Sequence, residues 1–335
     1  MTFNPFVTKA IYEVSKFLPE GATAVDLGNQ TLTATDEIFD EIIADASASK
    51  TKRSIDLFNA ISALRSLSSK ERGSKTAEYY RALGFSSYDA IDVNDLYGSL
   101  MMDLNSNLRE RYNFAKTYDL VTNLGTGEHI FNQLAIFENM HNLAKENGIL
   151  VHVMPFLNWI NHGFFNFNPT LYADIAAANG YKLLKMSVAN RWGFEVPVSL
   201  DNQTQTGRQP RPFMSALKRA YFLQGPNRVG ESRVKTRIRK TLRKVKLHRV
   251  PVDPLRLEDF IVQIMPGTLA EHTPLGRALK SIFAHERSIS GSEFVNVFVC
   301  AAMRKVNSDP FRIPIQSMYS DAVKSNEIKQ SYTTA

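Results

Sequence analysis

Apolar residues along this chain fall into short continuous runs, separated by stretches in which they recur every three or four positions. The clearest example is 118–156, where one apolar run stops at the turn 123–127. Apolar side chains then recur at helical spacing over 130–144, and a second apolar run covers 149–156. Continuous runs are typical of strands buried on both faces of a parallel sheet, and spaced residues are typical of an amphipathic helix. The stretch therefore predicts a strand, a turn, a helix and a strand.

The two ends of this predicted helix depend on single residues. Thr126 is placed to cap its start, and Glu128 lies in the first turn, where a negative charge suits the exposed N–H groups. Gly148 is predicted to end it, because glycine adopts the left-handed conformation without strain. Ligands of such sheets bind at the carboxyl ends of the strands. We therefore expect a ligand site near 123–128.

The same two patterns predict further elements on both sides of this unit. Helices are expected at 5–17, 35–47, 54–68, 76–83 and 169–179. Strands are expected at 23–28, 88–93, 99–104, 181–188 and 293–303. Strands that alternate with helices over 20–190 indicate an α/β fold with a doubly wound sheet.

The long gap between the last two strands predicts how the chain is divided. We expect an α/β core formed by residues 1–194 and 291–316. A basic, partly helical insertion is expected at 195–290, and a polar tail at 317–335.

Composition narrows the class of protein. The chain of 335 residues is 44% hydrophobic and 22% charged, as is ordinary for a globular protein. It contains no apolar run of about 18 residues and no secretory signal at its start, so no transmembrane segment and a cytoplasmic location are expected. Cys300 is the only cysteine, which excludes an intrachain disulfide and a cysteine-cluster metal site. No metal site is expected.

Charge is concentrated in one segment. The net charge is +7, but 208–249 contains fourteen Lys and Arg residues and one acid, so this segment carries +13 and the rest of the chain −6. Such a segment attracts phosphate, nucleic acid or anionic lipid. The commoner explanation is a basic helix face in water, with Arg237, Lys240 and Lys244 on it. The segment contains only three aromatic residues, Phe213, Tyr221 and Phe222, so no base-stacking surface is evident.

Acidic or amide residues lie at the ends of four of the predicted strands, and here the chain resembles the class I S-adenosylmethionine-dependent methyltransferases. The likeness is carried by the stretches AEYYRALGF, YDAIDVN, YDLVTNLGTGEHI and HGFFNFNPTLYADIAAANGY. It covers 20–190 and the strand at 293–303, and is greatest to bacterial members associated with glycan and small-molecule pathways. It implies a Rossmann-like, mostly parallel sheet of seven strands whose last strand, 293–303, is antiparallel.

The resemblance also implies S-adenosylmethionine as cofactor and a role for residues at the first two strand ends. Asp26 and Gly28, with Asn29 in the same turn, match the motif that lies against the methionine part of the cofactor. Asp92 matches the acid that accepts hydrogen bonds from both ribose hydroxyls. A carboxylate suits this role because it can accept two donors at once.

Two further strand ends complete the implied cofactor site. Asp103 and Leu104 match the position beside the adenine. Asn123 and Leu124 match the fourth strand end, where backbone groups face the sulfonium and the amino group. The family's first turn usually has three glycines, whereas this chain has only Gly28. A methyltransferase-like binding module without catalysis therefore stays open as an alternative.

The loop at 158–168 is expected to overhang the ligand site, since it leaves a strand at its carboxyl end. Its three phenylalanines either wall an acceptor pocket or plug the sheet edge. His162 is the candidate general base, because its ordinary pKa near 6.5 suits proton removal near neutral pH. Glu128 is the second candidate. His152 lies within a predicted strand, where a satisfied core histidine is the expectation.

These features together favour methyl transfer to an oxygen or nitrogen of a small molecule or glycan precursor, with an anionic acceptor suggested by the basic segment. An RNA methyltransferase that holds its substrate through 208–249 is the alternative enzyme. The sequence does not indicate the acceptor itself or the oligomeric state.

Overall fold

The computed structural model describes residues 2–48, 51–198, 274–291, 295–315 and 325. The chain divides into a unit of residues 1–199 with 253–335 and a second unit of residues 200–252. The second unit and the basic segment 208–249 lie outside the described residues. The predicted division of the chain at 194 and 290 therefore stays a prediction.

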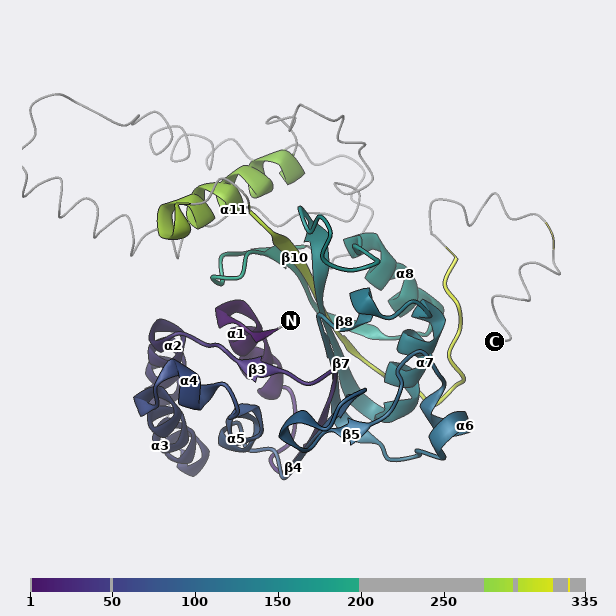
Figure 1. Cartoon of the computed structure of the whole chain (residues 1–335), viewed down its shortest axis with the longest axis horizontal. Helices are drawn as coiled ribbons and strands as arrows, with labels where there is room; N and C mark the ends of the chain where they lie inside the picture. The colour runs from purple at the N-terminus through teal and green to yellow at the C-terminus, as the bar shows by residue number, and fades with distance from the viewer. Residues whose placement is uncertain (1, 49–50, 199–273, 292–294, 316–324, 326–335) are drawn as a thin grey trace, which may run out of the picture. The chain divides into compact units, whose positions relative to one another are not determined.

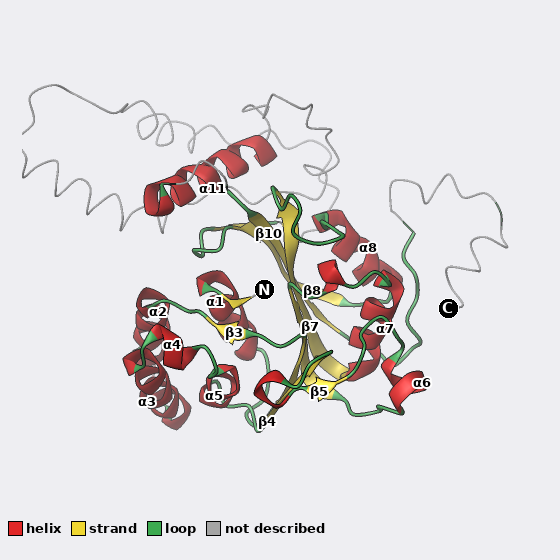
Figure 2. Ribbon diagram, in the orientation of Figure 1, coloured by secondary structure: helices red, strands yellow, loops and turns green. Residues whose placement is uncertain are grey.

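A sheet forms the centre of the first unit (Figure 2). It has eight strands in the order β5-β4-β2-β6-β7-β10-β8-β9. Its strands are β2 (Thr23–Leu27), β4 (Ser87–Asp92), β5 (Leu100–Met101), β6 (Tyr118–Leu124), β7 (Ala144–Leu157), β8 (Lys182–Ala189), β9 (Glu195–Pro197) and β10 (Val297–Arg304). The pairs from β5 to β7 are parallel, whereas β10 is antiparallel to both neighbours, β7 and β8. The predicted α/β sheet with an antiparallel late strand is confirmed. Strand β9 was not predicted, and neither was the separate two-stranded pair of β1 (Thr2–Phe3) and β3 (Thr31–Leu32).

Helices cover both faces of the sheet, as a doubly wound fold requires (Figure 1). One face carries α1 (Pro5–Ser15), α2 (Asp36–Ser47), α3 (Lys52–Ser66), α4 (Ser69–Arg72) and α5 (Thr76–Ala82). The other carries α6 (Leu108–Tyr112), α7 (Gln133–Leu143) and α8 (Pro169–Ala178). Helix α11 (Pro274–Ser290) is tied to the loop before β9, because Trp192 Nε1 donates to Glu286 Oε1 at 2.9 Å. Within these residues, no helix combines the length and the apolar character needed to cross a membrane.

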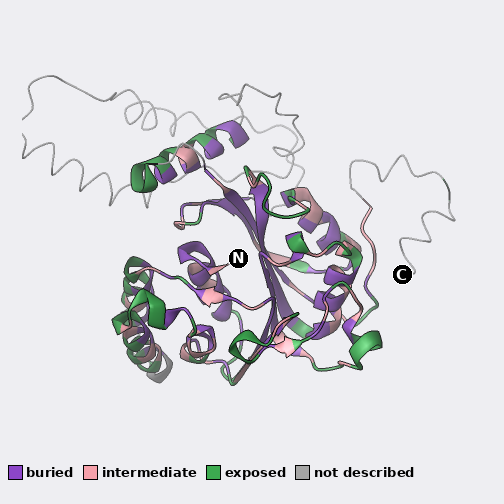
Figure 3. Ribbon diagram, in the orientation of Figure 1, coloured by how far each residue is buried: buried purple, intermediate pink, exposed green. Residues whose placement is uncertain are grey.

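The core lies along the central strands, which are buried on both faces (Figure 3). Leu120 and Val121 of β6 are fully buried, and so are Val151 and Val153 of β7. This two-sided burial explains why these strands appear in the sequence as continuous apolar runs. The sheet is therefore a rigid base for the loops that leave its carboxyl edge.

The helix predicted after β6 begins and ends elsewhere. Residues Gly127–His129 form the short 3-10 helix η2, and α7 begins only at Gln133, where the side chain of Asn132 accepts from the N–H of Ala135 at 3.3 Å. Thr126 makes no side-chain cap, so its predicted role was wrong. Gly148 lies inside β7 rather than after the helix, because the strand already begins at Ala144, which pairs with Tyr118.

Candidate functional site

The turns that follow β2 and β6 touch each other at the carboxyl edge of the sheet. Gly28 has φ +89°, and a Cβ atom on it would lie 2.0 Å from Oγ1 of Thr126. Its N–H donates to the carbonyl of Ile91 at the end of β4, at 2.7 Å. Only glycine fits this position, both for its conformation and for the contact. The single glycine of the first turn is therefore the one that brings three strand ends together.

Asp92 ends β4 and holds the first turn through its carboxylate. Oδ2 accepts from the N–H of Asn29 at 2.7 Å, and Oδ1 accepts from the N–H of Val93 at 2.6 Å and from Nδ2 of Asn94 at 2.9 Å. A carboxylate has about four acceptor sites, so about one is left. For Asp92 to accept hydrogen bonds from two ribose hydroxyls, the side chain of Asn94 would have to give up its bond to Oδ1.

Asn29 extends the same network. Its Nδ2 donates to Oγ of Ser99 at 2.8 Å and to the carbonyl of Leu96. Leu96 belongs to the 3-10 helix η1 (Leu96–Gly98) between β4 and β5. The turn after β2 is thereby bound to the loop between β4 and β5. The resemblance implies that the ribose of the cofactor would lie near this loop.

Asp26 is fully buried within β2 and surrounded by hydroxyl groups. Its carboxylate accepts from Tyr80 at 2.6 Å, from Tyr88 at 2.9 Å and from Thr122. Burial raises the pKa of this carboxyl to about 6, against the opposing effect of the three hydrogen bonds. The side chain joins β2 to α5, β4 and β6. Its implied role against the methionine part of the cofactor stays a prediction.

The other predicted cofactor residues lie at the same edge. Oδ1 of Asp103 accepts from the N–H of Asn105 at 2.9 Å, and this bond is the main cause that lowers the pKa of Asp103. Leu104 and Leu124 are buried. Asn123 is buried too, and its Oδ1 accepts from the N–H of Gly127 at 2.9 Å, which shapes the turn after β6. Their roles toward a cofactor also stay predictions.

Large apolar side chains are exposed along this edge instead of being packed away. Tyr97 adopts a left-handed conformation with φ 56° and is exposed. Other exposed apolar side chains near the ends of β4 and β5 are Val93, Leu96 and Met101. Exposed apolar side chains near a candidate ligand site are notable because large apolar groups are usually packed away from water.

Glu128 lies in η2, directly after β6, and is fully buried. Neither of its carboxylate oxygens has a hydrogen-bond partner among the described residues. Burial raises the pKa of Glu128 to about 7. Buried polar groups without a partner are rare in native proteins and each requires an explanation. At this position, the explanation we consider is a ligand.

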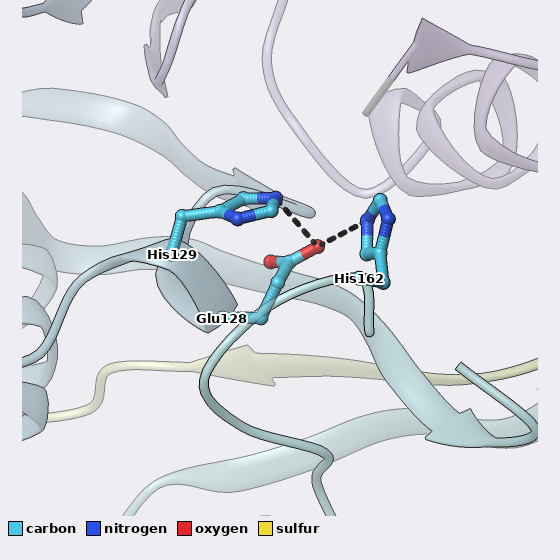
Figure 4. Close-up of side chains that lie close together, drawn as sticks. All are labelled: Glu128, His129 and His162. Carbon is cyan, nitrogen blue, oxygen red and sulfur yellow. Dashed lines mark ion pairs between the residues drawn. The ribbon is translucent and has the colours of Figure 1, made fainter. Parts of the chain in front are cut away.

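Two histidines flank this carboxylate (Figure 4). Nε2 of His162 lies 3.5 Å from Oε1 of Glu128, and Nε2 of His129 lies 3.8 Å from the same atom. The two imidazole rings meet edge to face with centroids 5.0 Å apart. Burial lowers the pKa of both histidines. Both are thus mainly neutral near pH 7 and can accept a proton or bind a metal ion.

The structure brings together the two acid–base candidates from the sequence, His162 and Glu128, and adds a third residue that sequence reasoning missed. This third residue is His129. The sequence feature that could have identified His129 is its position next to Glu128, after a turn that contains Gly125 and Gly127. Residues Gly127–His129 form the 3-10 helix η2. In this tight turn His129 and Glu128 point to the same partner in the loop after β7.

That loop is fixed by specific bonds. Asn158 and Asn161 adopt left-handed conformations with φ 63° and 57°, which asparagine tolerates better than most residues. Nδ2 of Asn158 donates to the carbonyl of Val295 at 2.9 Å, and Trp159 Nε1 donates to the carbonyl of Val297 at 3.0 Å. The loop is thereby anchored beside β10 and presents His162.

Gly163 allows the loop to pack directly on Glu128. A Cβ atom at this position would lie 2.8 Å from Cγ of Glu128. The next residue, Phe164, donates its N–H to the carbonyl of Glu128 at 2.7 Å. The loops after β6 and β7 are therefore joined at the site itself.

The phenylalanines of the loop divide between the two expected roles. Phe167 is 5% exposed and fills the core, as a plug would. Phe164 is 67% exposed and meets Phe131, which is 74% exposed, edge to face at 5.8 Å. Phe165 lies 6.3 Å from both rings. We call Phe131, Phe164 and Phe165 the aromatic patch.

His152 of β7 lies in the core, as expected, but among the described residues its hydrogen bonding is not fully satisfied, unlike that of the satisfied histidine that the sequence led us to expect. It is 1% exposed and lies between the rings of Phe137 and Tyr172, at 5.5 and 4.9 Å. Burial lowers the pKa of His152 to about 3, so it is neutral. Its Nδ1 has no hydrogen-bond partner within the described part of the chain, and neither has the hydroxyl of Tyr172.

Comparisons with known proteins give fold likenesses only. No protein-family model matches the chain, and no curated protein matches it. A SAM-dependent methyltransferase from Archaeoglobus fulgidus has 10% identity and a TM-score of 0.35 over 89% of this chain and 93% of that one. TehB from Haemophilus influenzae has 12% identity and a TM-score of 0.34 over 54% of each chain. Coclaurine N-methyltransferase, solved with N-methylheliamine and SAH, has 10% identity and a TM-score of 0.31 over 89% of this chain and 73% of that one. At these low scores the likenesses carry no argument about activity, and the strand order defines the fold.

Proposed function

We propose that this protein transfers a methyl group from S-adenosylmethionine to an oxygen or nitrogen of a small molecule or glycan precursor. The observation that carries the proposal is the sheet order, in which β10 is inserted antiparallel between β7 and β8. The resemblance to class I methyltransferases implied that this late strand is antiparallel. The polar strand ends at Asp92 and Asn123 support the same conclusion.

The residues at the first turn fit the proposed cofactor. Oε1 of Gln30, directly after the Gly28–Asn29 turn, is buried and has no hydrogen-bond partner among the described residues. It offers an acceptor for an ammonium group such as that of the methionine part. Asp92 would accept from the ribose, and the exposed side chains of Leu96 and Met101 would contact the adenine. The cofactor supplies an electrophilic methyl group on a charged sulfonium.

The acceptor would bind on the other side of the same edge, beside Glu128 and His162. A neutral His162 can take the proton that a hydroxyl or ammonium acceptor must lose. The carboxylate of Glu128, 3.5 Å away, would stabilise the imidazolium that results. The aromatic patch suits an acceptor with an apolar or ring-shaped part. Since methyl transfer is an in-line displacement, most of the acceleration would come from positioning the acceptor.

The test is direct binding of the cofactor. Calorimetric titration of the full chain with S-adenosylmethionine should give a saturable one-to-one isotherm, and mass spectrometry of the purified protein should detect S-adenosylhomocysteine. Absence of both would reject methyl transfer and leave a binding module of the same fold. RNA binding that weakens steeply with salt would instead favour the RNA alternative.

A further inference from the structure

We propose that Glu128, His129 and His162 bind a divalent transition-metal ion, although the sequence alone led us to expect no metal. Each residue offers one ligand atom, and the three atoms lie within 4.8 Å of one another (Figure 4). No other group of three such residues was found among the described ones. Two imidazoles and one carboxylate form a ligand set that zinc and non-haem iron sites share.

The distances fit a shared ion better than direct hydrogen bonds. The two imidazole nitrogens lie 3.5 and 3.8 Å from Oε1 of Glu128, beyond the usual range for N–H···O hydrogen bonds. Around Zn²⁺, with bonds of about 2.0–2.1 Å in a tetrahedral arrangement, neighbouring ligand atoms lie roughly 3.4 Å apart. The ligand nitrogens of His129 and His162 lie within 4.8 Å of each other. The side chains of His129 and His162 are 45% and 34% exposed, so both rings have room to turn toward a shared ion.

The burial of Glu128 is the second, independent observation. A fully buried carboxylate without a hydrogen-bond partner in the described part of the chain lacks the compensation that buried charges normally have. A metal ion supplies that compensation. Among the described residues, the buried hydroxyl of Tyr172 has no hydrogen-bond partner either, and burial and the charge of Glu128 raise the pKa of that hydroxyl.

The ligand types decide the class of ion. Imidazole nitrogen suits Zn²⁺, Co²⁺, Ni²⁺ and Fe²⁺, whereas Mg²⁺ and Ca²⁺ take oxygen ligands. Three protein ligands leave at least one coordination position open, as in catalytic zinc sites. That position would hold a water molecule or an oxygen atom of a bound acceptor.

The inference does not depend on methyl transfer, because metal binding can be measured without cofactor or acceptor. It changes one detail of the proposed function. A metal bound to Nε2 of His162 would prevent that nitrogen from accepting the acceptor's proton, so the general-base role through this atom applies only to the protein without metal. If EDTA does not affect turnover, His162 acts as a general base without a metal. If the protein does not bind S-adenosylmethionine, methyl transfer is rejected, but the metal proposal still stands or falls on the Zn²⁺ titration.

The experiment uses the full chain, freed of metal with EDTA and titrated with Zn²⁺ by calorimetry, with Mg²⁺ as the comparison ion. We expect one tight Zn²⁺ site and no comparable Mg²⁺ site. His129→Ala, His162→Ala and Glu128→Gln should each weaken Zn²⁺ binding at least about tenfold, since loss of even an outer partner has that effect. Glu110→Gln, which removes an exposed carboxylate of α6, should bind as the parent does.

A second measurement guards against variants that lose Zn²⁺ binding because they unfold. Co²⁺ bound to the parent should give visible absorption bands of a low-coordinate site, and these should be lost in the double variant of His129 and His162. Both histidines are partly exposed, so the double variant should keep the circular dichroism of the parent. A folded double variant that binds Zn²⁺ as tightly as the parent would overturn the proposal, and so would a parent that shows no Zn²⁺ site.

Discussion

At the scale of single residues, Asp92 links the first turn to the predicted ribose site. Replacing Asp92 with Ala should weaken S-adenosylmethionine binding at least tenfold, because each charged hydrogen bond lost costs about 1.5–3 kcal/mol. Titration calorimetry measures the change. Asp95→Ala is the matched control, because Asp95 is an exposed acid three residues away. Equal affinity in the two variants would remove Asp92 from the cofactor site.

His162 is the residue on which the chemistry of the acceptor depends. His162→Ala should lower kcat by about 10²–10⁴ if the imidazole takes the acceptor's proton, with the affinity for S-adenosylmethionine nearly intact. Ile160→Ala changes an 82% exposed side chain of the same loop and should leave kcat near that of the parent. Steady-state kinetics compare the two. Normal turnover by the His162 variant would show that His162 takes no part in proton transfer and that the loop 158–168 has only a structural role.

Asp26 predicts how stability depends on pH. Burial raises its pKa in the folded protein from 3.8 to about 6, so the folded state holds the proton more tightly than the unfolded state does. Its contribution to stability is complete below about pH 4 and is lost as pH rises to about 6, by roughly 3 kcal/mol at most. Denaturant unfolding of the parent and of Asp26→Asn across pH 4–7 should therefore diverge, with the parent losing stability relative to the variant. Parallel pH profiles would contradict this.

At the scale of elements, the contact between the loops after β6 and β7 requires glycine at position 163, which has no side chain. Gly163→Ala places a Cβ atom 2.8 Å from Cγ of Glu128, so one of the loops must move. We expect a loss of about 1–3 kcal/mol in the free energy of unfolding, as for other overpacked sites. In Gly73→Ala the nearest atom, Cγ2 of Thr31, would lie 3.2 Å from the new Cβ, so that control should lose less. Equal losses would mean that the contact with Glu128 is easily relaxed.

At the scale of the whole molecule, the basic segment 208–249 lies outside the described residues and stays a prediction from charge. Reversing Arg237, Lys240 and Lys244 to Glu should lower the affinity for an anionic substrate or surface and flatten its dependence on salt, because exposed charges act through screened fields. Binding of a phosphate-bearing acceptor or of RNA, measured from low to physiological salt, provides the comparison.

The control for that experiment makes the same change of charge elsewhere on the protein. Lys70, Arg81 and Lys182 are exposed residues of the described body, and reversing them changes the net charge equally. If both triple variants respond alike, the effect belongs to net charge and not to the segment.

Local patterns in the sequence determined the class of the fold and the positions of most elements. The strands β2, β4, β6, β8 and β10 and the helices α1, α2, α5 and α8 were each predicted from a pattern that lies within one element, so they can be identified without knowing the element's neighbours. The order of polar residues after the strands likewise indicated which edge of the sheet carries the candidate site, because parallel strands end at the same edge.

Only the tertiary structure decided the contacts between segments. The early start of β7, which displaced the predicted end of α7 and the role of Gly148, follows from the pairing of Ala144 with Tyr118. The occupied carboxylate of Asp92 depends on Asn29, which is 63 residues away in the chain. The grouping of His129 with Glu128 and His162 needs two loops whose positions are set by the order of β6, β7 and β10. Periodicity reports how one segment is buried, whereas a site assembled from several segments depends on strand order and register, which a single sequence does not contain.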